Sequence, residues 1–165
     1  KLSNNPDLYD VVLLGLVTGA RRMELWGLTW DDIDLKNRII NFRHTKNNKI
    51  RGLPMTEESF QVFKKRSKVI RLDTKLIFPS KKDPQKPMDF RAPFEKALEE
   101  GQISNFKFHD LRHSCASFLA MSGVPIRTIA EIIGHSNTSV TVRYSHLNQE
   151  HLKKSLDELS KILSN

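Results

Sequence analysis

HDLRHSCASFLAM, residues 109–121, is the segment from which the fold is most readily inferred. With about 100° between successive residues of a helix, Leu111 and Phe118 fall on one face of this segment. His109 and Arg112 fall on roughly the opposite face. Since the apolar face of such a helix packs against the core, we expect His109 and Arg112 to face outward together. The spacing alone does not decide whether they face a cleft or bulk solvent.

The same segment contains two histidines at the spacing of a zinc peptidase helix. His109 and His113 are four residues apart, as in HExxH. Asp110 stands in place of the glutamate, however, and Arg112 would bring a positive charge next to the metal. We therefore expect no zinc site here.

Apolar residues at helical spacing predict further helices on both sides of this segment. The predicted helices cover residues 8–18, 20–28, 56–70, 89–100, 109–121, 127–133 and 150–163. Met23, Leu25 and Trp26 are expected to point inward from the second of them.

Two short runs, 38–43 and 50–53, favour strands. Asn47 and Asn48 lie between them, and asparagine tolerates the positive φ of a hairpin tip. The sequence therefore predicts an α+β fold that is mainly α-helical with one small antiparallel β-sheet. No internal boundary divides residues 1–165, so we expect a single domain.

The composition favours an acidic partner. Lys and Arg number 27 against 19 Asp and Glu, which gives a net charge of +8, and the pI is about 9.7. This excess favours nucleic acid over a membrane surface. Cys115 is the only cysteine, so no intramolecular disulfide can form, which indicates a reducing compartment such as the cytoplasm. The longest apolar run, residues 11–17, is too short to cross a bilayer.

Three other segments carry candidate functional side chains. Arg21 precedes Glu24 by three residues, so the carboxylate is placed either to orient the guanidinium or to form an ordinary surface ion pair worth at most about 1 kcal/mol. The basic hairpin 43–51 includes Lys46, which can enter a site as an acid once substrate binds. Its Lys49 and Arg51 are expected to be solvated or to contact phosphate.

The third segment follows the helix predicted at 127–133. Gly134 is a candidate C-terminal cap, so that His135 leaves the helix either toward a cleft or to interact with the helix dipole. Tyr144 lies nine residues further on, between Arg143 and Ser145. Judged by its neighbours alone, this tyrosine is most simply a partly buried packing residue.

Taken together and in order, these segments resemble the tyrosine recombinases of the phage-integrase family along nearly the whole chain. The matching stretches are TGARRMELWGLTWDDID (18–34), TKNNKIRGLPM (45–55), HDLRHSCASFLAMSG (109–123) and IAEIIGHSNTSVTVRYSH (129–146). The resemblance implies six catalytic residues, which are Arg21, Lys46, His109, Arg112, His135 and Tyr144. Glu24 matches an acidic position beside the first arginine. The N-terminal core-binding domain of the family is missing, and the first residue is Lys1, so we expect the chain to be a fragment.

The resemblance also implies a function, that of a site-specific DNA recombinase or integrase of a mobile element. The tyrosine attacks a phosphodiester of double-stranded DNA to give a 3′-phosphotyrosyl bond and a free 5′-hydroxyl. Arg21, Arg112 and His135 would stabilise the transition state. His109 is the expected base and Lys46 the expected acid. The scheme uses no metal, ATP or other cofactor.

Further expectations concern contacts with DNA and with other copies. The candidate phosphate contacts are Arg22, Arg43, Lys49, Arg51, Arg127 and Arg143. The C-terminal leucines 152, 156, 159 and 163 form an apolar stripe. This stripe would cover the chain's own core or, as the resemblance implies, be exchanged between protomers on DNA. The alternative functions are a type IB topoisomerase-like enzyme, a DNA-binding regulator with a non-functional site and, least favoured, a metal-dependent hydrolase.

Overall fold

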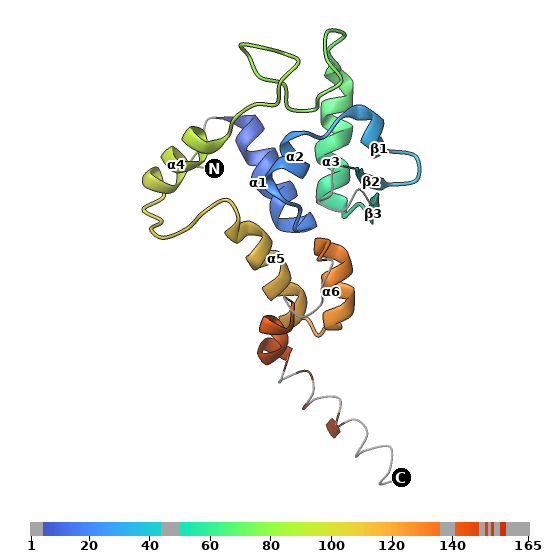
Figure 1. The fold of residues 1–165 in the computed structure, drawn as a ribbon, viewed down its shortest axis with the longest axis vertical. Coiled ribbons are helices and arrows are strands. Elements are labelled where there is room, and N and C mark those ends of the chain that lie inside the picture. Colours follow the sequence, from blue (N-terminus) through green and yellow to red (C-terminus); the bar gives the residue numbers. More distant parts are fainter. Residues whose placement is uncertain are drawn as a thin grey trace.

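The computed structural model describes residues 5–43, 50–135, 141–148, 151, 153, 156 and 157. Helices dominate these residues, and one small sheet lies beside them (Figure 1). This confirms the predicted fold class. The α-helices are α1 (Pro6–Thr18), α2 (Arg22–Trp26), α3 (Glu57–Arg66), α4 (Arg91–Glu100), α5 (Asp110–Met121) and α6 (Ile126–Ile133). The 3-10 helices are η1 (Trp30–Asp32), η2 (Ser67–Val69) and η4 (Val142–Asn148).

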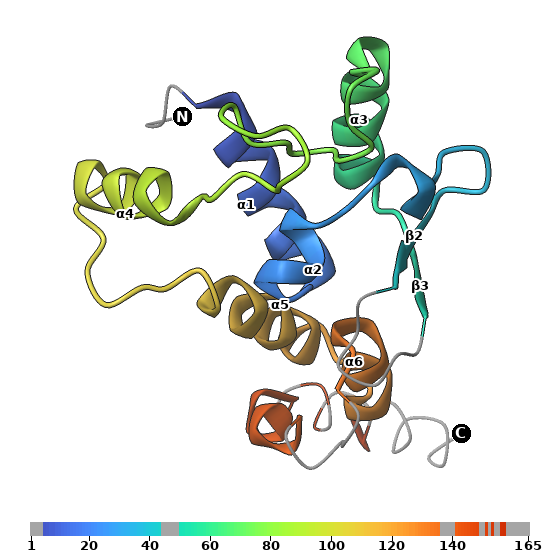
Figure 2. The same ribbon diagram turned by 45° about the horizontal axis from the view of Figure 1, so that its top comes forward.

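The sheet is antiparallel, with the strand order β1 (Ile33–Asp34), β2 (Ile39–Phe42) and β3 (Arg51–Pro54). β2 and β3 lie side by side in Figure 2, with Ile40 opposite Leu53. Both predicted strands are thus present. The hairpin tip between them, which includes Lys46 and Lys49, lies outside the described residues.

Helix α5 joins two apolar clusters. Leu111 belongs to the larger cluster. That cluster is built by residues of α1, α2, α3 and the sheet, together with the phenylalanines around α4. Cys115, Ala116 and Ala120 belong to the smaller one, with residues of α6 and with Tyr144 of η4. Because α5 packs against α1 on one side and against α6 and η4 on another, most of its circumference is covered.

This covering corrects the expected orientation of α5. Phe118, expected in the core, is 62% exposed, whereas Arg112, expected to face outward, is only 3% exposed. In α2, Leu25 and Trp26 point inward as predicted, but Met23 is 57% exposed. Helical periodicity gives one apolar face, and it cannot show that a second element will cover the opposite face.

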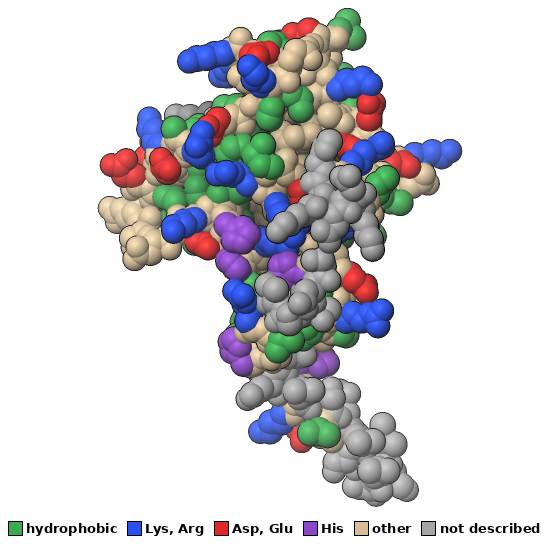
Figure 3. Space-filling view, viewed as in Figure 1, with side chains coloured by type: hydrophobic (Ala, Val, Ile, Leu, Met, Phe, Trp, Pro, Cys, Tyr) green, Lys and Arg blue, Asp and Glu red, His purple; other side chains and the backbone are tan. Residues whose placement is uncertain are grey.

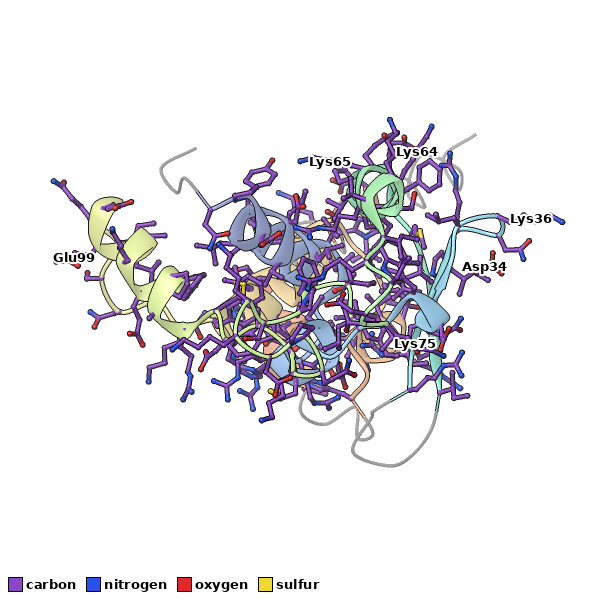
Figure 4. All side chains as sticks on the ribbon, turned by 90° about the horizontal axis from the view of Figure 1, so that it is seen from above. Asp34, Lys36, Lys64, Lys65, Lys75 and Glu99 are labelled. Atoms are coloured by element: carbon purple, nitrogen blue, oxygen red, sulfur yellow. The ribbon has the colours of Figure 1, made fainter. Side chains whose placement is uncertain are left out.

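Most charged side chains lie at the edges of the molecule. Lys64 and Lys65 on α3, and Asp34 and Lys36 at the β1–β2 turn, point away from the interior in Figure 4. The described buried charges are therefore exceptional, and they are Asp10, Glu24, Asp32 and Arg112. Within the described ranges, no helix combines the length and the apolar character needed to span a membrane.

The end of α1 is fixed by a close contact with the end of α6. Gly19 caps α1 in the left-handed region, with φ of 57°. A Cβ atom added there would lie 2.6 Å from Ile133 Cγ2. Glycine is therefore required at this position both by the backbone angle and by the space available.

We predict that Gly19→Ala lowers the free energy of unfolding by at least about 1–2 kcal/mol, because it adds left-handed strain to a steric clash. Gly52→Ala is the matched control, since a Cβ there would meet no atom of the described residues nearer than Asn41 Oδ1 at 3.5 Å. Urea denaturation followed by circular dichroism measures both variants. Equal losses in the two variants would contradict this explanation.

Candidate active site

Arg21 is held at the start of α2 by a buried carboxylate. Its Nη1 donates to Glu24 Oε1 at 2.7 Å, and its backbone N–H donates to Glu24 Oε2 at 2.9 Å. The Glu24 side chain is only 3% exposed, so this is not an ordinary surface ion pair. Arg21 Nη2 donates to the carbonyl oxygen of Gly134 at 2.9 Å. The guanidinium is thus fixed from two sides.

Arg112 is buried and bound by backbone carbonyls. Its Nη1 donates to the oxygen of Gly19 at 2.7 Å and to the oxygen of Ile133. Burial, together with the positive charges of Arg21 and Arg51, lowers the pKa of Arg112 to about 10, so the side chain is still a cation at neutral pH. Its buried Nη2 has no hydrogen-bond partner within the described ranges. A buried donor without a partner is costly, and an anion would satisfy it.

Arg51 lies inside the molecule, which corrects the expectation of a solvated hairpin residue. Its side chain is 11% exposed. Nη2 donates to Glu24 Oε2 at 3.2 Å, and Nη1 donates to the oxygen of Ile132. The guanidinium also stacks over Phe42, 4.3 Å from the ring centroid. The alternation of β3 was the available signal, because Arg51 shares a face with the buried Leu53.

Three arginines therefore converge on the end of one helix. The carbonyl oxygens of Ile132, Ile133 and Gly134 accept from Arg51, Arg112 and Arg21 respectively. Glu24 is the carboxylate paired with Arg21 and Arg51. Three guanidiniums against one carboxylate leave an excess of positive charge, which suits an anion.

His135 follows directly and is held by Thr141. The two side chains meet through His135 Nδ1 and Thr141 Oγ1 at 2.8 Å. Burial and the charges of Arg112 and Arg21 lower the pKa of His135 to about 4. At neutral pH the imidazole is therefore neutral and carries one N–H, which can be donated to a bound oxygen.

Tyr144 lies on η4 and is 6% exposed. Its hydroxyl is 2.5 Å from Nδ1 of His113. Burial raises the pKa of Tyr144, and the charges of Arg143 and Arg112 partly oppose that rise. Sequence reasoning assigned His113 no role beyond a rejected zinc site, although its position four residues after His109 places both on one face of α5 and was a signal that it faces the same site.

His109 lies at the start of α5 and is exposed. Its ring meets the ring of His113 edge to face, with centroids 4.9 Å apart. Burial and the neighbouring His113 and Arg112 lower the pKa of His109. Histidine and basic side chains gather at the narrow middle of one face in Figure 3. Lys46, the sixth expected catalytic residue, lies outside the described residues.

The other expected DNA contacts have varied surroundings. The guanidinium of Arg22 stacks over Trp26, with its Cζ 5.2 Å from the ring centroid. Arg43 pairs with the buried Asp32 at 2.8 Å, and its side chain is half exposed. Arg127 forms an exposed pair with Glu131 at 3.4 Å. Arg143 is exposed on η4, and Lys49 lies outside the described residues.

The chain is similar to known proteins in sequence and in fold. Residues 4–151 match the phage integrase family. The chain is 31% identical to the integrase of Salmonella phage P22 over 169 residues, covering 94% of this chain but 43% of that protein. The catalytic domain of bacteriophage HP1 integrase has a TM-score of 0.69 at 32% identity, covering 94% of this chain and 83% of that one. The Tn1549 transposon integrase in complex with circular intermediate DNA has a TM-score of 0.72 at 27% identity, covering 84% and 55%.

We predict that Arg51→Met lowers the free energy of unfolding by about 3 kcal/mol, because it leaves a buried carboxylate with one partner fewer and a carbonyl unpaired. Arg127→Met is the control, since its exposed ion pair contributes about 0–1 kcal/mol. Equilibrium denaturation of the two variants tests the difference. Similar free energies of unfolding in the two variants would mean that Arg51 does not stabilise the fold through Glu24 and the carbonyl of Ile132.

Proposed function

Because the chain belongs to the phage integrase family, we propose that it breaks and rejoins DNA strands through a 3′-phosphotyrosyl bond on Tyr144. The observation that supports this most strongly is the buried Arg112, whose Nη2 is unpartnered within the described ranges, near a second arginine and a tyrosine. This chain spans less than half the length of the P22 integrase. We therefore propose this activity for the whole protein, and we propose that the whole protein includes an N-terminal core-binding domain.

The chemistry follows from the charges that develop on phosphorus. Attack by the tyrosine oxygen places negative charge on the non-bridging oxygens, where Arg21 and Arg112 would donate paired hydrogen bonds. His135 would add a neutral donor. Removal of one such donor typically costs on the order of 100-fold or more in rate. Lys46 is the proposed acid that protonates the departing 5′-oxygen.

Rejoining needs no external energy source in this scheme. One phosphate ester replaces another, so the energy of the bond is kept in the phosphotyrosyl link. The 5′-hydroxyl of the same or of another strand then attacks that link. We propose that the chain acts in recombination of double-stranded DNA in the cytoplasm. The basic composition and the DNA-bound Tn1549 relative support a DNA substrate, and the single cysteine supports a reducing compartment.

If Tyr144 is the nucleophile, the protein should form a covalent adduct with DNA. Incubation with a suicide DNA substrate of the element's attachment site, in EDTA, should give a protein–DNA band with the wild-type chain and none with Tyr144→Phe. Tyr9→Phe is the matched control, since Tyr9 is the other tyrosine of the chain and is 59% exposed. An adduct that survives Tyr144→Phe, or that is lost with Tyr9→Phe, would refute the assignment.

We propose further that copies of the chain assemble on DNA by exchanging residues 150–163. Leu156 is 66% exposed, and Phe118 and Met121 present an apolar surface on α5 with exposures of 62% and 63%. Most of the exchanged segment lies outside the described residues. Its burial against another copy would cover apolar surface that is otherwise in contact with water.

Sedimentation on a DNA carrying two binding sites tests the exchange. The full chain should form a larger complex than a chain that ends at His151. If the two chains give the same assembly, the exchange proposal is wrong.

A further inference from the structure

The hydroxyl of Tyr144 is held by a histidine outside the six residues that the family resemblance supplied. His113 lies one residue after Arg112 on α5, and its Nδ1 is 2.5 Å from Tyr144 Oη. The two rings are tilted by 43° with centroids 6.3 Å apart. His113 is partly buried, and Tyr144 belongs to the apolar cluster beneath η4. This contact joins the reacting atom of the proposed function to a group that can take its proton.

We propose that His113 is the catalytic residue that accepts the phenolic proton when Tyr144 attacks DNA, and that returns it on rejoining. The inference rests on the proposed function. As the Oη–H bond breaks, an Nδ1–H bond forms, and the oxygen lone pair makes the new O–P bond. The P–O5′ bond breaks, and the 5′-oxygen takes a proton from a separate acid, for which Lys46 is the proposed donor. Rejoining reverses each transfer.

The surroundings of the hydroxyl make such an acceptor necessary. An ordinary tyrosine has a pKa of about 10, and burial moves the pKa of Tyr144 further upward. The phenol is therefore protonated at neutral pH and needs a base within hydrogen-bond distance. His113 meets that requirement when its proton is on Nε2, which leaves the lone pair of Nδ1 facing the hydroxyl.

His109, the base expected from the family resemblance, is placed differently. Its ring packs against the ring of His113, and its side chain is exposed at the start of α5. Among the described residues, the other titratable or charged groups around the pair are Arg112 on α5, His135 after α6, and Arg143 on η4. The two arginines are cations and favour the phenolate once it forms, whereas His135 is neutral.

The test separates proton transfer from simple positioning. In His113→Asn the side-chain amide can still form a hydrogen bond near the position of Nδ1, but it cannot take a proton. We expect single-turnover adduct formation to fall on the order of 100-fold. We also expect the rate of the variant to keep rising with pH beyond the point at which the wild-type rate levels off. Imidazole added to His113→Ala should restore part of the rate, and either variant suffices if the other does not fold.

Two control variants share the assay. His146→Asn changes an exposed histidine of η4, two residues after the tyrosine, and should stay within about twofold of wild type. His109→Asn should keep the shape of the wild-type pH profile.

The outcomes distinguish this inference from the proposed function. Absence of a wild-type adduct refutes the proposed function itself. A wild-type adduct with an unchanged rate in His113→Asn refutes only the role of His113. If the His113 variants lose rate but keep the wild-type pH profile and are not rescued by imidazole, His113 only positions the tyrosine, and the inference is overturned. If His109→Asn changes the pH profile and His113→Asn does not, His109 accepts the proton, and the inference is again overturned.

Discussion

The site depends on the C-terminal end of α6, where three successive carbonyl oxygens bind three arginines. A helix leaves its last carbonyls without partners inside the helix, and its dipole favours positive charge there. Arg51, Arg112 and Arg21 come from β3, α5 and the start of α2. Their guanidiniums therefore join segments that are far apart in the sequence. Any change that moves this helix end moves the whole basic cluster.

The same arrangement keeps the cluster positively charged and ready for an anion. Backbone carbonyls stabilise a guanidinium without cancelling its charge, and Glu24 neutralises only part of the total. The positive charge is therefore already in place without a ligand, so that little reorganisation would be needed in the proposed reaction with DNA. His135 continues the chain directly from this helix end, and its bond to Thr141 connects the cluster to the segment that carries Tyr144.

The local sequence pattern was sufficient to predict most of the fold and part of the site. Apolar periodicity located α1, α5 and α6, and the short spacing between Arg21 and Glu24 indicated their pairing. Arg112 was misplaced because its partners are carbonyls of residues 19 and 133, which no local pattern brings together. The contacts of Arg51 and His113 were not predicted for the same reason, since their partners Glu24 and Tyr144 are distant in sequence. The contacts of Arg112 and His113 form only where α5 packs against α1, α6 and η4. Those of Arg51 form only where β3 meets α2 and α6.

The central claim is that this basic cluster serves Tyr144 as nucleophile, and identification of the residue joined to DNA tests it most directly. The covalent product would be digested with protease and nuclease, and the modified peptide sequenced by mass spectrometry. The structure predicts one modified peptide, with a 3′-linked nucleotide on the oxygen of Tyr144. A nucleotide on Tyr9, on a serine or on a histidine would contradict the account, because the attacking atom would then not be the Tyr144 hydroxyl oxygen that lies beside His113.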